Sequence, residues 1–263
     1  MAKRYFRTLM ASLIRPATVA AAIFALSSPA YSQSYPDAKA VVTVGGPVTE
    51  IVYALGEQDR IVARDTTSVY PPEANQLPDV GYMRRLSPEG VLSVNPDLII
   101  ARDTSGPPET MDLLKAASVP VVLTRDGFSP DAVLASIRTG GEALGVQEKA
   151  NALATDVEGD LARLAERVDA LEKRRKVMFV FSLRGGRRNV AGRDTGANGS
   201  IEMAGGDNVM ASSFTGYKLV DAEAVISAAP DLIVMMEGRG KHRVSSDDLF
   251  NLPQMKLTPA GEN

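Results

Sequence analysis

The sequence predicts an α/β protein with two similar α/β lobes, mainly parallel sheets and a long helical segment between the lobes. Three observations lead to this prediction. Short β-branched runs alternate with helical patterns in both halves, an apolar stripe of helical period lies between them, and one stretch of the first half aligns with one of the second. Strands that alternate with helices are typical of βα units and parallel sheets.

Residues 1–32 read as a secretory signal peptide and not as part of the fold. Four basic residues precede an apolar run at 17–26, and the small residues before Ser32 form a cleavage site. The run is too short for a comfortable membrane span, and no later stretch reaches about 18 apolar residues. We expect cleavage near Ser32 and export to the periplasm; an uncleaved anchor is the alternative.

The composition excludes several classes of protein. Without the four basic residues of the leader, 25 of the 29 Lys and Arg remain against 32 Asp and Glu, a net charge of about −7. This charge argues against a nucleic-acid partner. The absence of cysteine excludes disulfides, thiolate metal sites and cysteine nucleophiles. An exported protein without disulfides suits a bacterial periplasm.

The N-terminal α/β lobe is expected over residues 33–128. Helical patterns separate its short apolar runs, so we expect neighbouring strands to pair in parallel. The predicted strands are the runs at 40–44, 60–64, 97–101 and 119–123.

An inter-lobe helical segment is expected over residues 129–175. Apolar residues recur there at steps of three and four, which predicts one long amphipathic helix from Gln147 to Arg174. At 1.5 Å per residue it would be roughly 40 Å long. A surface helix and a coiled coil with a partner are the alternatives. The apolar stripe consists of Ala150, Leu153, Val157, Leu161, Leu164, Val168 and Leu171.

The C-terminal α/β lobe is expected over residues 176–263, and an internal repeat relates it to the first lobe. Residues 86–106 align without a gap on residues 220–240, at a constant offset of 134. Such self-similarity indicates a repeated structural unit. In both copies a cap residue, Ser87 or Asp221, is expected to start a short helix, followed by a Pro-Asp that opens a buried strand.

The second copy of the repeat is expected to be incomplete. In the first lobe a helix and the strand "VPVVL" follow the Pro-Asp strand, whereas the corresponding place in the second lobe holds "PQMKLTPAGEN". We expect this lobe to lack a strand and a final helix, as in a truncated gene model; a naturally short lobe is the alternative.

Catalytic constellations are hard to build from these residues. His242 is the only histidine, which excludes a histidine-based triad and a multi-histidine metal site. Neither a P-loop nor a GxGxxG turn occurs. The glycines of "VGGP" could hold an anion at a helix N-terminus, although a tight turn is the simpler interpretation. We expect a ligand-binding protein and not an enzyme.

The stretch "DVGYMRRLSPEG" at 79–90 is the most informative candidate site. Tyr82 lies between a turn glycine and two arginines, Arg84 and Arg85, in a loop that ends at Ser87. Sites are often found on such loops. One interpretation is a packed tyrosine with a hydrogen-bonded hydroxyl. The other is a phenolate, which a nearby cation and ferric iron both favour, and tyrosinate is a recognised haem ligand.

Four stretches together resemble a known family. They are "GGPVTEIVYALG", "ARDTTSVYPPEANQLPDVGYMRRLSPEGVLSVNPDLII", "VAGRDTGANGSIEMAGGDN" and "GYKLVDAEAVISAAPDLIVMMEGRG". They are similar to the periplasmic haem-binding proteins of bacterial haem-uptake ABC transporters, within the helical-backbone class of substrate-binding proteins. The resemblance covers essentially the whole chain after the leader. The class also includes cobalamin and siderophore binders, and "VGYMR" is its most specific part here.

The resemblance implies a set of haem-binding residues. The axial tyrosine of the family falls on Tyr82, which would ligate Fe(III), and Arg84 would line the same face of the pocket. Arg239 falls on the arginine that hydrogen-bonds the ligand tyrosine from the opposite lobe. Some members add a histidine before a Gly-Gly pair, where this sequence has Arg184. This departure favours five-coordinate iron unless His242 substitutes.

Further pocket residues are expected from the chemistry of haem. Its two propionates need cations or amide donors, and the candidates are Arg184, Arg187 and Arg188. Its apolar faces need cover, for which the candidates are Tyr70, Met83 and Tyr217; each of these could instead belong to the core.

The resemblance also implies partners. In this transporter class the first helix of each lobe presents a carboxylate to the permease, and the matching residues are Glu50 and Glu202; either alone would read as a solvated glutamate. The implied function is delivery of haem to an inner-membrane ABC permease by a monomer, with haem arriving through an outer-membrane receptor system. The alternatives are a ferric-siderophore or cobalamin binder and, more remotely, an exported flavodoxin-like enzyme.

Overall fold

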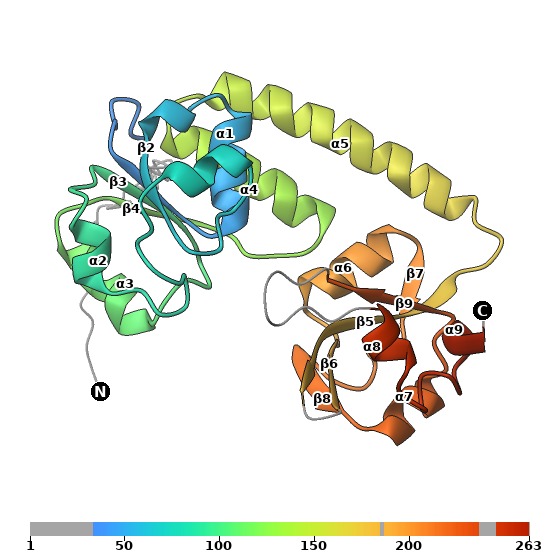
Figure 1. Cartoon of the computed structure of the whole chain (residues 1–263). Helices are drawn as coiled ribbons and strands as arrows, with labels where there is room; N and C mark the ends of the chain where they lie inside the picture. Colours follow the sequence, from blue (N-terminus) through green and yellow to red (C-terminus); the bar gives the residue numbers. More distant parts are fainter. Residues whose placement is uncertain (1–33, 185–186, 237–245, 263) are drawn as a thin grey trace, which may run out of the picture. The chain divides into compact units, whose positions relative to one another are not determined.

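The first lobe contains a four-stranded parallel sheet. The computed structural model describes residues 34–184, 187–236 and 246–262 (Figure 1). The sheet has the order β2-β1-β3-β4 and overlaps all four predicted strands. Every pairing in it is parallel, as predicted from the alternation with helices. The strands are β1 (Val41–Val44), β2 (Ile61–Arg64), β3 (Leu98–Arg102) and β4 (Val121–Thr124).

Helices cover both faces of this sheet. On one face Val48, Ile137 and Ala154 share a core with Leu98 and Ile100 of β3. Val48, Ile137 and Ala154 come, in this order, from α1 (Gly46–Ala54), α4 (Pro130–Ala143) and α5 (Gln147–Asp169). Figure 1 shows the same three helices gathered on one side of the sheet.

The opposite face is covered by two shorter helices. Val91 of α2 (Pro88–Leu92) and Leu114 of α3 (Pro108–Ala116) pack there against Ile99 of β3. Successive residues of a strand point to opposite faces, so β3 is buried on both sides, as is usual for a central parallel strand. Two short 3-10 helices, η1 (Gln58–Arg60) and η2 (Pro72–Gln76), complete the connections.

The helical segment consists of two helices and not one continuous rod. Gly145, with φ 74°, ends α4 and allows the chain to turn into α5. The predicted helix begins at Gln147 as expected but ends at Asp169 instead of Arg174, so its 23 residues span about 34 Å. It ends early because β5 (Arg175–Arg184) starts to pair with β7 (Gly206–Asn208) at Arg175.

The second lobe contains a mixed sheet of order β7-β5-β6-β8, with β9 also paired to β5. β5 runs parallel to β7 and β9, whereas β6 folds back on β5 and then pairs antiparallel with β8. The predicted class of two α/β lobes is confirmed, and this hairpin is an addition that the alternation of patterns did not indicate. The further strands are β6 (Arg187–Ala191), β8 (Tyr217–Val220) and β9 (Leu232–Met235).

The main core cluster of the second lobe combines residues of its sheet and its helices. Met178, Val225 and Leu249 are buried there together. The helices of the lobe are α6 (Gly196–Met203), α7 (Ala222–Ala228), α8 (Ser246–Phe250) and α9 (Pro259–Glu262). Among the described residues, no helix has the length and apolar character needed to cross a membrane. The expected lack of a strand and a final helix stays a prediction.

The internal repeat is confirmed in detail at the offset of 134. The side chain of Ser87 caps α2 by accepting from the backbone N–H of Gly90 at 2.9 Å, and that of Asp221 caps α7 by accepting from Ala224 at 2.9 Å. Behind each helix, Asn95 and its equivalent Ala229 both adopt positive φ, of 49° and 44°. The repeat thus conserves backbone conformation as well as sequence pattern.

A second shared feature is the aspartate that opens the central strand. Asp97 accepts hydrogen bonds from the backbone N–H groups of Lys39 and Ala40, and its equivalent Asp231 accepts one from Lys176. This backbone hydrogen bond lowers the pKa of Asp231 below its ordinary value. In each lobe, therefore, the Pro-Asp of the repeat ties the start of one strand to the start of its neighbour.

Asn tolerates left-handed backbone better than Ala does, since its short polar side chain bonds locally. We predict that Ala229→Asn raises the free energy of unfolding by about 1 kcal/mol, measured by urea denaturation. The matched control Ala228→Asn, one residue earlier and inside α7, should instead destabilise by about 0.5 kcal/mol. A loss of stability in Ala229→Asn would contradict the left-handed conformation at this position.

Glu57 adds a polar link between α5 and the first lobe. Its carboxylate accepts from Lys149 of α5 at 2.6 Å and from Arg60 at 3.2 Å, and Arg60 also donates to the carbonyl oxygens of Tyr35, Ala38 and Leu144. Desolvation alone would raise the pKa of Glu57, but the hydrogen bonds and charges of its two cationic partners outweigh it and lower the pKa.

Because the pKa of Glu57 is lower in the folded state, its ionised form contributes stability above its ordinary value of 4.5. That contribution is lost as the pH falls through the lower folded pKa. We predict that Glu57→Gln costs about 1 kcal/mol at pH 7, and that the difference from the unaltered protein disappears once the pH lies below the folded pKa of Glu57. Urea denaturation at both pH values measures this, and an unchanged difference at low pH would exclude an ionic role.

Candidate functional site

Tyr82 lies on an exposed turn that is anchored at both ends. Gly81, with φ 104°, turns the chain immediately before it, and the Tyr82 carbonyl oxygen accepts from the N–H of Arg85 at 2.7 Å. The Tyr82 side chain is 42% exposed. The next residue, Met83, is buried, and its carbonyl oxygen accepts from the N–H of Gly106. The Tyr82 phenol is therefore exposed to solvent on a short segment that backbone hydrogen bonds hold in place.

The position of Met83 decides between the two roles predicted for it. It was a candidate for covering a ligand face or for the core, and the structure favours the core, where it packs with Leu86, Val91 and Met111. A long flexible thioether fills such a space well. Met83 thus anchors the turn in the core of the first lobe. It is no longer a candidate for contact with the ligand.

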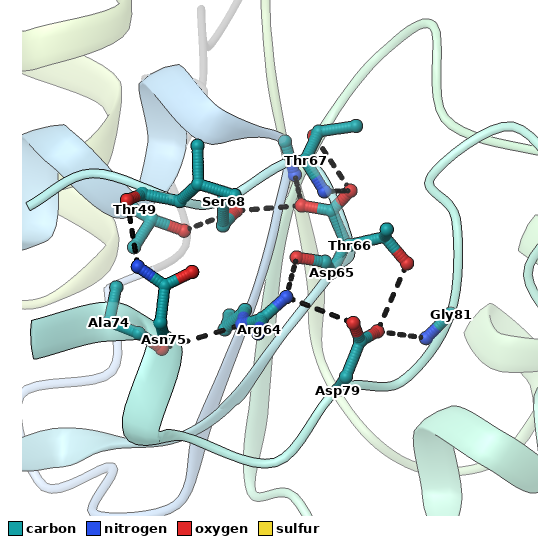
Figure 2. Close-up of polar contacts among 12 residues, drawn as sticks. Thr49, Arg64, Asp65, Thr66, Thr67, Ser68, Ala74, Asn75, Asp79 and Gly81 are labelled. Carbon is teal, nitrogen blue, oxygen red and sulfur yellow. Dashed lines mark hydrogen bonds and ion pairs between the residues drawn. The ribbon is translucent and has the colours of Figure 1, made fainter. Parts of the chain in front are cut away.

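The carboxylate of Asp79 fixes the start of the turn (Figure 2). Its Oδ1 accepts from the backbone N–H of Gly81 at 2.8 Å and from Oγ1 of Thr66 at 3.1 Å. Its Oδ2 accepts from Nη1 of Arg64 at 2.9 Å. Arg64 is itself buried and also donates to the carbonyl oxygen of Asp65 at 3.0 Å. One carboxylate therefore holds the glycine before Tyr82 and neutralises a buried guanidinium.

Backbone hydrogen bonds extend this connection between β2 and the turn. The N–H of Arg64 donates to the carbonyl oxygen of Pro78, the N–H of Val80 donates to that of Arg64, and the N–H of Thr66 donates to that of Gly81, at 2.9 to 3.0 Å. Arg64 and Asp79 form a parallel bridge. The segment before Tyr82 thus runs along the edge of the sheet as a short added strand.

Asp65 organises the neighbouring loop in a similar way. Its fully buried carboxylate accepts from Gly45 N–H at 2.8 Å and from the Ser68 hydroxyl at 2.7 Å on one oxygen, and from Thr67 N–H and hydroxyl on the other. Ser68 in turn accepts from the hydroxyl of Thr49 (Figure 2). The Gly45 N–H at the start of α1 therefore already donates to a carboxylate of the protein. This favours the tight-turn interpretation of "VGGP" over a site for an external anion.

Arg84 carries a positive charge two residues after Tyr82 in the sequence. It is exposed and forms no ion pair within the described residues. Its neighbour Arg102 is half-buried and paired with Asp126, and desolvation, followed by the nearby charge of Arg84, lowers the pKa of Arg102. The charge of Arg102 is thus compensated by a carboxylate, whereas that of Arg84 remains available for an anion.

The two other predicted tyrosines have separate surroundings. Tyr70 is exposed at the edge of a pocket of about 420 Å³, which Glu50 and Arg102 also line. Tyr217 follows Gly216, with φ 77°, at the start of β8 and is 43% exposed. Its ring lies 5.1 Å from that of Phe181, centroid to centroid. Phe181 is a site candidate that the sequence reasoning missed.

Among the predicted propionate partners, the structure describes the side-chain surroundings of Arg188, whereas the roles of Arg184 and Arg187 stay predictions. Arg188 is wrong as a candidate, because it is 1% exposed and the Gln254 amide, in its hydrogen-bonding orientation, accepts from its guanidinium. Arg184 ends β5 and pairs in register with Arg187 at the start of β6. Arg239 and His242 lie outside the described residues.

The two predicted docking glutamates occupy equivalent helices. Glu50 lies on α1, the first helix of the first lobe, and Glu202 lies on α6, the first helix of the second, and both are exposed. Desolvation of the part of Glu50 that borders the pocket raises its pKa. In the part of the chain that the structure describes, no group of three or more His, Asp or Glu lies close enough to hold a metal ion.

The structure predicts that Asp79 positions the turn of Tyr82. Asp79→Ala removes the acceptor of Gly81 N–H and leaves the Arg64 guanidinium buried without its carboxylate, so we expect a loss of about 2 kcal/mol in unfolding free energy. Amide hydrogen exchange at Gly81 should accelerate as well.

The control for this prediction is Asp112→Ala, which removes an exposed carboxylate that lies 3.8 Å from Lys115 on α3. Exposed pairs of this kind contribute about 0.5 kcal/mol or less. Equal, small effects of the two substitutions would contradict the role assigned to Asp79.

Comparisons with known proteins identify the family. The model of the periplasmic binding proteins matches residues 41–263. The solved periplasmic heme-binding protein RhuT from Roseiflexus sp. RS-1 shares 35% of its sequence and has a TM-score of 0.79, over 85% of this chain and 86% of that one. It has the same two-lobed α/β fold.

Two curated relatives are more distant. An uncharacterized ABC transporter substrate-binding lipoprotein, YvrC of Bacillus subtilis, is 31% identical over 203 residues, which are 76% of this chain. A vitamin B12-binding protein of Vibrio parahaemolyticus is 26% identical over 211 residues, which are 80% of this chain. The chain spans 64% of the Bacillus protein and 74% of the Vibrio protein. By the match over residues 41–263, the chain belongs to the periplasmic binding protein family.

Proposed function

We propose that this protein binds haem in the periplasm and delivers it to an inner-membrane ABC permease. Periplasmic binding proteins act outside the cytoplasm, where they bind a ligand for an importer and catalyse no reaction. The observation that carries the choice of haem is the exposed Tyr82, which lies on a turn held by Asp79. The similarity to a solved heme-binding protein supports the same choice.

The chemistry of Tyr82 suits ferric iron. A free phenol has a pKa of about 10, so an isolated tyrosine is protonated at neutral pH. Fe(III) replaces the proton and bonds the anionic oxygen, and tyrosinate is a recognised ligand of haem iron. Because Asp79 already fixes the turn, little conformational freedom is lost when the bond forms.

The remaining contacts would bind the two ends of the macrocycle. We assign the propionates to Arg84 and to the β5–β6 hairpin with Arg184 and Arg187, since guanidinium groups pair well with carboxylates. Arg239 would hydrogen-bond the phenolate from the second lobe. Tyr70 and Tyr217 would cover apolar surface of the haem between the lobes.

The proposed transport role also gives functions to other parts of the chain. Residues 1–32 would direct export and be cleaved near Ser32. Glu50 and Glu202, one on the first helix of each lobe, would pair with arginines of the permease and orient the monomer on it. Such exposed charges contribute orientation and encounter rate more than affinity. Haem would reach this protein from an outer-membrane receptor system.

Cobalamin is the second candidate ligand, because a relative that is 26% identical is a vitamin B12-binding protein. Its cobalt is already held by the corrin ring and needs no phenolate from the protein. The two ligands therefore make different demands on Tyr82, and the role of this residue discriminates between them.

We predict that Tyr82→Phe weakens binding of ferric haem by roughly 100-fold, or about 2.7 kcal/mol, because the iron loses its anionic ligand. The visible charge-transfer band of phenolate bound to iron should disappear at the same time. Both are measured by titrating haem into the mature protein and following the absorption spectrum.

The control is Tyr53→Phe, which removes a hydroxyl from α1 on the first lobe. It should leave affinity and spectrum unchanged. Unaltered binding and spectrum in Tyr82→Phe would remove Tyr82 as the ligand. Tight binding of cobalamin without measurable binding of haem would replace haem by the second candidate.

A further inference from the structure

An apolar pocket opens between three helices of the first lobe. It is the pocket of about 420 Å³ at whose edge Tyr70 lies. Its walls come mainly from α1, α4 and α5, the helices that Figure 1 shows gathered on one side of the sheet. A volume of this size is enough for a small molecule or for large side chains of a partner. The apolar residues of its walls include Ile51, Val133, Ile137, Leu153 and Val157.

The packing of α4 against α5 explains why a pocket is present. Near the end of α4, a Cβ on Gly141 would collide with the Cβ of Ala150, so the two helices touch there with no side chain between them. Closer to the start of α4, Val133 and Ile137 line open space instead. Val133 stays 37% exposed on this wall. Exposed apolar surface around a pocket is typical of interaction sites.

Glu50 places one uncompensated carboxylate on the lining of this pocket. It forms no ion pair in the part of the chain that the structure describes. Burial alone, without an opposing cation, raises its pKa. Arg102 and Arg125 also line the pocket, and Arg102 is already paired with Asp126. A carboxylate that has lost part of its water gains from a cation that a partner brings.

We propose that this pocket receives an apolar side chain of the ABC permease, from a segment in which an arginine next to that side chain pairs with Glu50. The proposal rests on the proposed function, which gives Glu50 a permease arginine, and it adds an apolar contact beside that ion pair. An exposed ion pair contributes orientation more than affinity. An apolar side chain that fills a pocket contributes affinity, because it leaves water.

The charge of the chain favours this occupant over a second copy of the protein. After the leader the chain carries 32 Asp and Glu against 25 of its 29 Lys and Arg, so two copies repel each other. The carboxylate of Glu50 also selects a partner with a cation beside its apolar group.

The test measures binding of the ligand-free mature protein to the permease and ATPase of its transporter, reconstituted in nanodiscs, by biolayer interferometry. Val133→Ser removes part of the apolar wall and should weaken binding about 5-fold. Ala54→Phe, at an exposed position of α1 that lines the pocket, should fill it and weaken binding about 10-fold. Thermal melts establish that each variant is folded.

Salt separates the apolar contact from the ion pair. Glu50→Gln should weaken binding several-fold at low salt and have little effect at about 1 M salt, where charges are screened within about 3 Å. The effect of Val133→Ser should persist at both salt concentrations, because burial of apolar surface does not depend on charge.

The matched control is Leu113→Ser, because Leu113 is 58% exposed on α3 and does not line this pocket. It should leave binding to the permease unchanged. Haem titrations of Val133→Ser and Ala54→Phe should match those of the unaltered protein. A loss of haem binding in these folded variants would place the pocket in the ligand site and overturn the proposal.

The remaining outcomes separate the pocket from the proposed function. Weaker binding in Glu50→Gln with unchanged binding in Val133→Ser and Ala54→Phe would leave the ion pair standing and remove the apolar contact. Absence of any binding to the permease would contradict the delivery role and the pocket together. A dimer of the isolated protein that Ala54→Phe converts to a monomer, by light scattering, would assign the pocket to a second copy and overturn the proposal.

Discussion

The ion pair between Asp79 and Arg64 is the interaction on which the candidate iron-binding turn depends. Arg64 closes β2 with a buried guanidinium, and a buried charge without a partner is costly. Asp79 compensates that charge and with its other oxygen holds Gly81, the residue before Tyr82. The stability of the sheet edge and the position of the phenol are therefore coupled through a single carboxylate.

A glycine and a tyrosine precede the repeat in both lobes, but the two pairs are supported differently. Tyr82 follows Gly81 on a turn held by side-chain bonds, whereas Tyr217 follows Gly216 and enters β8, where backbone pairing with β6 fixes it. A turn presents its hydroxyl outward, and a strand presents a ring to a neighbouring ring, Phe181. The Gly-Tyr pairs of the two lobes thus supply one exposed phenol on a turn and one ring that lies against a neighbouring ring.

Local patterns in the sequence predicted much of this structure. The caps Ser87 and Asp221 and the exposed turn of Tyr82 follow from residue types and spacing alone. The partnership of Arg64 and Asp79 did not, because it depends on how residues 78–81 run along β2. Arg188 was expected at a pocket mouth on its charge alone, but its side chain is buried within the second lobe.

Two other features depend on tertiary pairing and had no local signal. The long helix ends at Asp169 because β7 pairs with the residues from Arg175 onward, and the bulge at Phe181 exists only through the register of β5 on β6. The most direct test of the account is a crystal structure of the haem complex. It should show iron bonded to the Tyr82 oxygen, with Asp79 still bound to Gly81 and Arg64. Iron held by any other residue would contradict it.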